Sequence, residues 1–229
     1  MLSRTDWPGQ CLICRAWPAA TLCPRCVARF GAPVPRCEGC ALPLPLPAGA
    51  ARCGACLREP PPFERCLVAA GYGWPWARCI GQFKFRGDPG LAAPLAAMLV
   101  AAPGVAQALA EADLVLPVPL SAERLSERGY NPAQLLAQAM APGRVRTGLL
   151  LRPRHTPPQH GLPRAERLKN VRGAYAVDPP KAPLLHGRRV ALVDDVMTTG
   201  ASLREAARAL RDAGAAHVTA LAFARTDEP

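Results

Sequence analysis

Apolar and polar residues alternate along residues 63–229 in blocks that predict strands and helices in turn. Short runs rich in branched apolar residues have the length of strands, at 113–118, 145–151, 190–193 and 217–223. Between the last two, apolar residues recur at helical spacing over 203–213, and Gly214 suits the position just past the end of that helix. A strand, a helix and a strand in this order predict a right-handed βαβ unit of an open parallel sheet, so the expected fold class is α/β.

One long apolar run, residues 91–110, is rich in alanine and is interrupted by Pro94, Pro103, Gly104 and Gln107. Alanine contributes little to membrane insertion, so this run predicts a core-facing helix and no membrane span. Residues 1–10 lack the apolar core of a secretory signal. We therefore expect a cytoplasmic protein.

The first quarter of the chain is rich in cysteine. Eight cysteines form four Cys-x-x-Cys pairs: Cys11 and Cys14, Cys23 and Cys26, Cys37 and Cys40, Cys53 and Cys56. Each pair places two thiolates on one tight turn, and two pairs complete a tetrahedral zinc site. The four pairs predict two structural Zn²⁺ ions, with redox-active dithiols as the alternative. Sequential pairing is the simplest arrangement, and an interleaved one fits the same spacing.

A run of three prolines, residues 60–62, forms a stiff linker at which the composition changes. It predicts a cysteine-rich zinc domain over residues 1–62 and an α/β domain over residues 63–229. Because residues 11–56 contain few large apolar side chains, metal must supply most of the folding energy of the first domain.

The stretch VALVDDVMTTGAS, residues 190–202, carries the strongest chemical signal. A buried strand leads into Asp194 and Asp195, and a Thr-Thr-Gly turn then opens a helix. Ligands of open parallel sheets lie at the carboxyl ends of the strands, and the free N–H groups of a helix start favour a phosphate. Two carboxylates beside this phosphate cradle suit sugar hydroxyls or a bridging Mg²⁺. The stretch predicts a site for a phosphorylated sugar, with a structural Asp pair as the alternative.

The same thirteen residues resemble the phosphoribosyl-pyrophosphate (PRPP) signature of type I phosphoribosyltransferases. With the four Cys-x-x-Cys pairs and three further segments, the chain resembles the ComF family of competence-associated proteins over nearly its full length. The segments are FKFRGD at 83–88, PVPLSAERLSERGYNPAQLLA at 117–137 and TPPQHGLPRAERLKNVRGAY at 156–175. The resemblance implies a type I phosphoribosyltransferase-like parallel sheet with a small N-terminal double zinc-ribbon module. It also implies a link to the uptake of transforming single-stranded DNA.

Candidate site residues follow from this resemblance. The 5′-phosphate of PRPP, bound with Mg²⁺, would be held by Thr198, Thr199, Gly200, Ala201 and Ser202. Asp194 and Asp195 would hold the ribose hydroxyls, and with Arg167 they are the candidate catalytic residues. Pro119, in a pyrophosphate loop over 117–120, and Arg128 would contact phosphates, with a simple proline-rich turn as the alternative. Thr198 stands where enzymes acting on 6-oxopurines carry an acid, which argues against salvage of hypoxanthine or guanine.

The formal net charge of +11 is concentrated in the middle of the chain, because residues 144–172 contain eight Lys or Arg and one acid, Glu166. Such a stretch favours a polyanionic partner. By the resemblance residues 152–172 would form a mobile hood over the sugar, and the candidate contacts to single-stranded DNA in it are Arg164, Arg167 and Lys169. Lys84 and Arg86 alternate with Phe83 and Phe85. On a strand this would place both charges on one face, as DNA contacts or as an ordinary amphipathic edge strand.

Two functions fit these features. The favoured one is a ComF-like protein that binds PRPP or a phosphorylated ribose and assists the handling of single-stranded DNA in natural transformation, alongside proteins of the uptake machinery. The alternative is a catalytic phosphoribosyltransferase of nucleotide metabolism. The basic segment and the zinc module favour the first, and the sugar-phosphate signature fits both. A zinc adaptor with a vestigial domain would predict a damaged signature, whereas this one is intact.

Overall fold

A four-stranded parallel sheet forms the centre of the protein in the computed structural model, which describes residues 9–45, 51–153 and 173–227. The strand order is β1-β6-β5-β2. The strands are β1 (Arg65–Gly71), β2 (Leu114–Pro117), β5 (Arg189–Met197) and β6 (His217–Arg225). The predicted parallel α/β sheet is confirmed, and β1 is a strand that we did not predict.

The expected strand over 145–151 is wrong in extent. Only its last two residues form a strand, β3 (Leu150–Leu151), which pairs antiparallel with β4 (Ala176–Val177) in a separate small sheet. Val145 makes an isolated parallel bridge to Val115 of β2. The chain therefore leaves the edge of the main sheet after one contact instead of adding a fifth strand to it.

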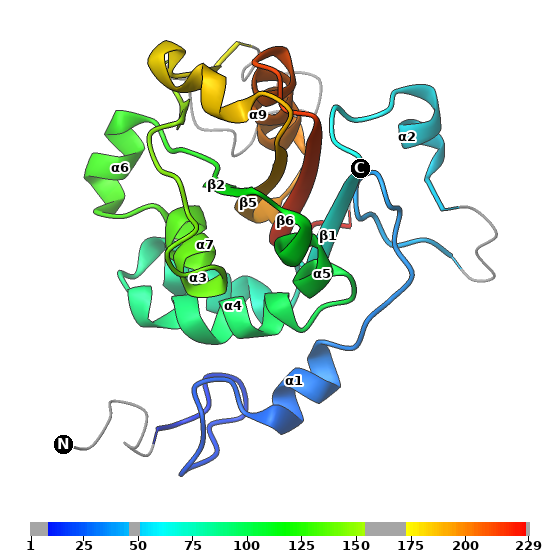
Figure 1. The fold of residues 1–229 in the computed structure, drawn as a ribbon. Helices are drawn as coiled ribbons and strands as arrows, with labels where there is room; N and C mark the ends of the chain where they lie inside the picture. Colours follow the sequence, from blue (N-terminus) through cyan, green and yellow to red (C-terminus); the bar gives the residue numbers. More distant parts are fainter. Residues whose placement is uncertain (1–8, 46–50, 154–172, 228–229) are drawn as a thin grey trace.

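Both faces of the main sheet are covered. Val190 and Leu192 of β5 pack in one core with helix α9 (Ala201–Asp212), whereas Ala191 and Val193 pack in a second core. The helices of the second core are α3 (Trp76–Phe85), α4 (Ala92–Val100), α5 (Val105–Glu111) and α7 (Pro132–Met140). Figure 1 shows α9 on one side of the sheet and α3, α4 and α7 on the other. Burial on both faces explains why residues 190–193 are all apolar.

The predicted helix after β5 is confirmed as α9 (Ala201–Asp212). It begins two residues before the predicted start, because its first turn consists of small residues that carry no apolar periodicity. Gly200 precedes it at φ +76°, and Gly214 follows it at φ +95°. Both glycines occupy the left-handed region that side chains with a Cβ disfavour, which accounts for their positions at the two helix ends.

The apolar run over 91–110 forms two helices, not the single one expected. A short 3₁₀ helix, η1 (Pro89–Leu91), leads into α4, and the chain turns at Gly104 (φ +79°) before α5. Among the described residues, no single helix is long and apolar enough to cross a membrane. Helices η1–α4 and α5 meet that length and composition only as a pair, and the chain bends by 95° between them.

The two cysteine-rich segments lie at separate places on the α/β core (Figure 1). Helix α1 (Pro24–Phe30) belongs to the first segment and lies beyond α4, whereas α2 (Gly54–Arg58) belongs to the second and lies beyond β1. Cys37, Cys40 and Cys56 of the second segment pack in the same core as Val190. The domain boundary between residues 62 and 63 stays a prediction. The remaining helices within the described ranges are α6 (Ala122–Arg128) and η2 (Pro179–Leu185).

Candidate functional site

A pocket of about 320 Å³ opens where β5 extends beyond its neighbour β2. Strand β2 pairs with β5 only as far as Val193, whose carbonyl accepts a hydrogen bond of 2.8 Å from the Val118 N–H. Beyond this point β5 continues along β6 to Met197. Asp194 and Asp195 lie in this extension, which is open on the β2 side. The crevice is the place where ligands of open parallel sheets bind.

Most of the residues predicted from the signature line this one pocket. They are Pro119, Arg128, Asp194, Asp195, Thr198, Gly200, Ala201 and Ser202. Thr199 is not among the lining residues, since it is buried and its Oγ1 accepts a hydrogen bond of 3.3 Å from the Ala201 N–H. Arg164, Arg167 and Lys169 lie outside the described residues.

The acidic pair sits on one side of the pocket and already has a cationic partner. Lys84 Nζ lies 2.7 Å from Asp195 Oδ1. The Asp195 N–H donates to Asp194 Oδ1 at 2.8 Å, and the Val196 N–H donates to Asp195 Oδ1 at 2.6 Å. Burial raises the pKa of Asp194 to about 7, and the neighbouring charge of Asp195 acts in the same direction. With Lys84 included, this side carries little net negative charge near neutral pH.

The placement of Lys84 corrects the strand expected at FKFRGD. These residues end helix α3, so Lys84 and Arg86 do not share a face with alternating aromatics between them. Lys84 lines the pocket, whereas Arg86 is exposed outside it. Phe83 is buried, and Phe85 is 64% exposed at the pocket edge. Four alternating residues mimicked a strand, whereas the apolar spacing over the longer window from Trp76 to Phe83 is helical.

The first turn of α9 lines the same pocket as the acidic pair. Gly200 brings the backbone to the pocket wall at φ +76°, and a Cβ at this position would come within 2.5 Å of Met197 Cε. Helix starts present free N–H groups and the positive end of the helix dipole. The arrangement can therefore hold a phosphate close to carboxylates that accept hydroxyl hydrogen bonds.

A basic wall, made of Arg124, Arg128 and Arg152, faces the same pocket. Arg124 and Arg128 both lie on α6, one helical turn apart. The Arg128 guanidinium lies over the Phe85 ring, 5.1 Å from its centroid, and Arg152 lies over Tyr175 at 5.3 Å. Burial lowers the pKa of Arg124, and the charge of Arg152 lowers it further. Three guanidinium groups lining one pocket favour a bound anion with more than one negative charge.

The loop after β2 is held in place by Asn131. Its side-chain amide donates to the Val118 carbonyl at 2.9 Å, and its Oδ1 accepts from the Ala133 N–H at 3.0 Å, which caps α7. The loop that carries Pro119 is thus fixed to the helix behind it. Its outward side is left to line the pocket.

The eight paired cysteines form two clusters with the sequential pairing. Cys11, Cys14, Cys23 and Cys26 make one cluster, and Cys37, Cys40, Cys53 and Cys56 make the other, with the sulfur atoms of each within 4.8 Å of one another. The Cys53 N–H donates to Cys37 Sγ at 3.1 Å, as expected of a cysteine knuckle that presents a thiolate. The interleaved alternative is thereby excluded. Four converging thiolates fit a structural Zn²⁺, so each cluster can hold one ion.

Comparison with known proteins agrees with this architecture. Residues 99–228 match the phosphoribosyl transferase domain model. The DNA utilization protein YhgH of Salmonella typhimurium is 32% identical over 231 aligned residues, which cover 96% of this chain and 98% of that protein. Competence protein F of Haemophilus influenzae is 33% identical over 77% of this chain and 79% of its own length. This chain belongs to the ComF family. Competence protein ComFC of Bacillus subtilis is 31% identical over a region that covers 64% of this chain and 58% of that protein.

In this ComF-family protein, two tyrosines line the pocket without having been predicted. Tyr72 follows β1 and is 38% exposed, and Tyr175 precedes β4 and is buried. Burial raises the pKa of the Tyr175 phenol, while the nearby Arg152 charge and the Ser202 hydroxyl act in the opposite direction. Tyr175 ends the family segment 156–175 but was assigned no role there, and Tyr72 belongs to none of the segments that carry the resemblance. Only the folding of β1 and of the small second sheet brings them to the site.

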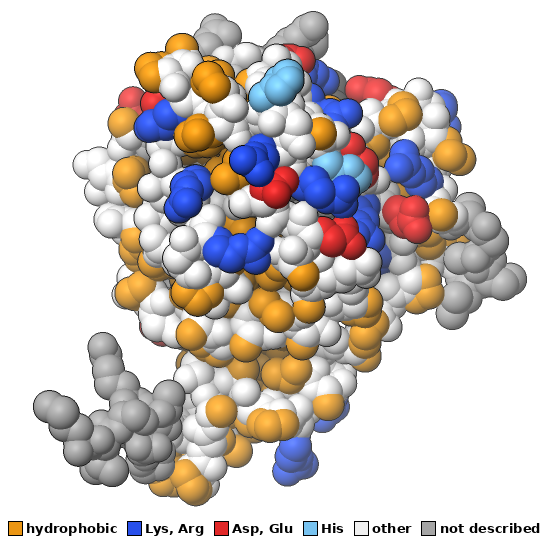
Figure 2. Space-filling view, in the orientation of Figure 1, with side chains coloured by type: hydrophobic (Ala, Val, Ile, Leu, Met, Phe, Trp, Pro, Cys, Tyr) orange, Lys and Arg blue, Asp and Glu red, His pale blue; other side chains and the backbone are white. Residues whose placement is uncertain are grey.

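The surface charge of this ComF-family protein is mixed on the face shown in Figure 2. Basic and acidic side chains are interleaved over its upper part, and apolar side chains prevail over its lower part. The net positive charge is therefore not displayed as one uniform patch on this face. The basic wall inside the pocket is the better candidate for selective contact with a phosphate group.

Proposed function

We propose that this ComF-family protein binds a 5′-phosphorylated ribose in the pocket and assists the handling of single-stranded DNA in the cytoplasm during natural transformation. The observation that carries the proposal is the meeting of Asp194 and Asp195 with the start of α9 and with three arginines around one cavity. Carboxylates suit ribose hydroxyls, and a helix start suits a phosphate. The basic wall suits a further phosphate.

In this proposal residues 198–202 hold the 5′-phosphate, and Asp194 and Asp195 accept hydrogen bonds from the ribose hydroxyls. Pro119 and Arg128, with Arg124 beside them, contact a pyrophosphate or the next phosphate of a strand. Any Mg²⁺ would arrive with the pyrophosphate of PRPP, since Asp195 is already paired with Lys84. Arg164, Arg167 and Lys169 keep their proposed roles at the DNA strand, and each cysteine cluster holds one structural Zn²⁺.

The aromatic edge of the pocket favours the end of a nucleic acid strand as the ligand. Tyr72 and Phe85 both line the pocket and both are exposed, and Arg128 lies against the Phe85 ring. Stacking of a base on an aromatic side chain contributes ~1–3 kcal/mol and accepts any base. A 5′-terminal nucleotide could then place its phosphate and sugar in the pocket and its base on this edge. The names of the relatives, DNA utilization protein and competence protein, point to the same class of ligand.

Binding of single strands that differ only at the 5′ end tests this proposal. We expect an oligonucleotide with a 5′-phosphate to bind more tightly than the same oligonucleotide with a 5′-hydroxyl, measured by fluorescence anisotropy. The logarithm of the binding constant should fall with log salt by ~0.7 per phosphate contact. Loss of the gene should reduce transformation in a competent host. Equal affinities for the two oligonucleotides, with normal transformation, would contradict the proposal.

Catalytic phosphoribosyl transfer is the second candidate, favoured by the fixed loop at Pro119 beside the basic wall, which suits a pyrophosphate leaving group. This activity is measured as the release of pyrophosphate from PRPP in the presence of a panel of nucleobases. Turnover that requires one base, in a protein without preference for a 5′-phosphorylated strand, would establish the transferase instead.

A further inference from the structure

Lys84 occupies an unusual place for a lysine. It comes from the last turn of α3, crosses to the extended end of β5 and forms an ion pair of 2.7 Å with Asp195 inside the pocket. The side chain of Lys84 is 17% exposed and that of Asp195 is 11% exposed. Both charges are thus largely removed from water. A surface ion pair contributes little, but removing one partner of a buried pair leaves a costly uncompensated charge.

The pairing answers the electrostatic problem posed by two adjacent carboxylates. Asp194 and Asp195 stand side by side in a partly buried crevice, where like charges repel and desolvation disfavours both anions. The Lys84 ammonium and the Val196 N–H both bind Oδ1 of Asp195. Oδ2 takes part in neither of these two contacts, so we assign the ribose hydroxyl to it. Lys84 therefore fixes the orientation of the carboxylate without using both of its oxygens.

The same pairing fits poorly with a divalent metal held by the protein. Mg²⁺ requires near-octahedral oxygen ligands, usually one or two of them carboxylates. At this site Asp195 Oδ1 is taken by an ammonium group, which would repel a metal ion bound to the same carboxylate. The raised pKa of Asp194 further reduces the negative charge that the acidic pair could present to a metal ion near neutral pH. The acidic pair as folded is a site for hydroxyl groups and not for a metal ion.

We propose that Lys84 is the resident counter-cation of the acidic pair, and that the pocket consequently binds a ribose 5-phosphate group without a divalent metal ion. Lys84 acts here as a positioning residue, because it holds Asp195 for the sugar and replaces the charge that a metal would supply. The inference rests on the proposed function, since it specifies how the same pocket recognises its ligand.

Calorimetric titration with ribose 5-phosphate tests the inference. The buffer is freed of metal by passage over a chelating resin, because a soluble chelator would also remove metal from the cysteine clusters, and the titration is repeated with millimolar Mg²⁺. We expect the same affinity in both buffers for the wild type. Lys84→Met should weaken binding roughly tenfold or more in metal-free buffer, as for a lost charge-assisted contact, and Mg²⁺ should restore part of it. Lys84→Arg keeps the cation and should stay independent of metal.

Lys181→Met is the matched control. Lys181 forms an ion pair of 2.9 Å with Asp178, away from the pocket lining, so its loss should leave both titrations unchanged. Zinc content and circular dichroism confirm that each variant is folded. Wild-type binding that requires Mg²⁺, or Lys84→Met binding equal to the wild type without metal, would overturn the inference and leave the proposed function standing. Absence of binding by the wild type in both buffers would instead overturn the proposed function.

Discussion

The two four-cysteine clusters have the same ligands and the same Cys-x-x-Cys spacing, yet their surroundings differ. In the first cluster Cys14 is exposed, and the other three cysteines form a small apolar cluster with Ile13, Ala19 and Phe30. In the second, three cysteines belong to the core that contains β5, β6 and α9. The first cluster is thus an attachment to the helical layer, held in part by the Trp76 side chain, whose Nε1–H donates to the Phe30 carbonyl at 2.7 Å. The second is part of the α/β core.

The second cluster is also bonded to the strands that shape the pocket. The buried Arg225, 3% exposed, donates from Nε to the Cys40 carbonyl at 3.0 Å. The Arg225 carbonyl accepts from the Tyr72 N–H at 2.7 Å, and the Thr226 N–H donates to the Met197 carbonyl at 3.1 Å. Tyr72 and Met197 both line the pocket. Identical metal motifs can therefore stabilise a local fold in one place and support a ligand site in another.

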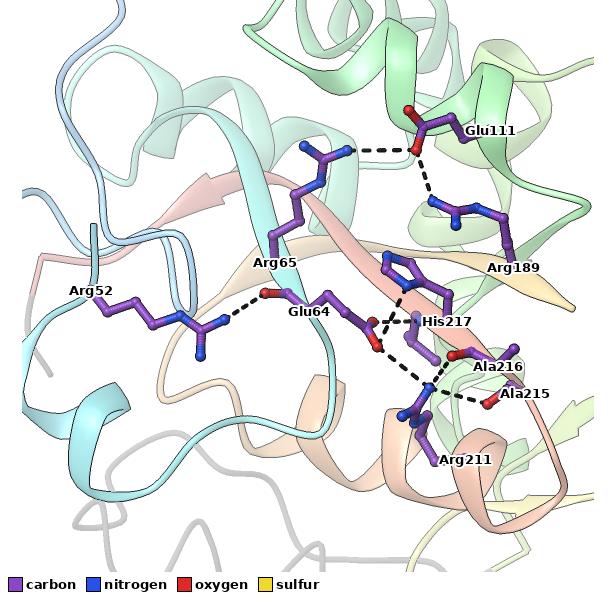
Figure 3. Close-up of polar contacts among 10 residues, drawn as sticks. Arg52, Glu64, Arg65, Glu111, Arg189, Arg211, Ala215, Ala216 and His217 are labelled. Carbon is purple, nitrogen blue, oxygen red and sulfur yellow. Dashed lines mark hydrogen bonds and ion pairs between the residues drawn. The ribbon is translucent and has the colours of Figure 1, made fainter. Parts of the chain in front are cut away.

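The opposite end of the sheet is tied to the second cluster as well. Figure 3 shows Arg52, which neighbours Cys53, donating to the Glu64 carbonyl at 3.0 Å, just before β1. The Glu64 carboxylate in turn lies 3.4 Å from Arg211 at the end of α9 and 3.6 Å from His217 at the start of β6. Loss of the second cluster would therefore disturb both ends of the sheet.

The largest expected effect is the difference between two variants, Cys56→Ser and Cys26→Ser. Each variant removes the last ligand of one cluster. Binding of a structural Zn²⁺ contributes ~10–16 kcal/mol in small zinc domains, so each variant should lose the fold that its metal supports. Cys56→Ser should unfold the α/β core and abolish ribose 5-phosphate binding. Cys26→Ser should lower the zinc content by one ion and leave the main thermal transition and the binding intact. Calorimetry and metal analysis measure both. Equal damage by the two variants would remove the distinction between the clusters.

Arg225→Met tests the difference between the two clusters at a single side chain. A hydrogen bond to a charged group contributes ~1.5–3 kcal/mol, so urea unfolding should show a loss of this size, with weaker ligand binding. Arg29→Met, at the first cluster, is the control: Arg29 is exposed over the Phe30 ring at 5.1 Å, and such contacts contribute ~0.5–1 kcal/mol. A loss at Arg29 as large as that at Arg225 would contradict the proposed asymmetry.

Replacing Asp194 and Asp195 together by Asn distinguishes ligand binding by the pocket from stabilisation of the pocket by the second cluster. Two charged acceptors are lost, each typically worth ~1.5–3 kcal/mol in hydrogen bonds, so ribose 5-phosphate should bind at least tenfold more weakly. The zinc content should not change, in contrast to Cys56→Ser. Calorimetric titration beside metal analysis measures both quantities, and unchanged affinity would mean that the Asp pair is structural.

The last expected effect is a pH dependence of stability. The pKa of Asp194 is raised to about 7 in the folded protein, so between its ordinary value and about 7 the folded state keeps a proton that the unfolded state has lost. Stability should therefore fall as pH rises through this window. Asp194→Asn should remove that fall, whereas thiolate protonation at the clusters is the same in both proteins. Urea unfolding of the wild type and of Asp194→Asn across this pH range should show a fall in stability for the wild type alone. Parallel pH profiles of the two proteins would contradict the prediction.

The sequence predicts local features of this protein better than their placement. Cys-x-x-Cys spacing is enough for two four-cysteine clusters, although only the structure decides between sequential and interleaved pairing. The run from Val190 into α9 is enough for the strand, the turn and the helix, because these depend on neighbours along the chain. The position of each cluster depends on distant contacts such as Phe30 with Trp76 and Cys40 with Arg225. Lys84 was misplaced for the same reason, since only the packing of α3 against the sheet brings it to Asp195.

A crystal structure of the protein soaked with ribose 5-phosphate tests the central claim most directly. We expect the phosphate at the backbone of residues 198–202 and the ribose hydroxyls on Asp194 and Asp195, with Lys84 still paired to Asp195. A pocket that stays empty at saturating ligand, or a ligand bound with its phosphate on the arginines and its hydroxyls away from the acidic pair, would contradict it.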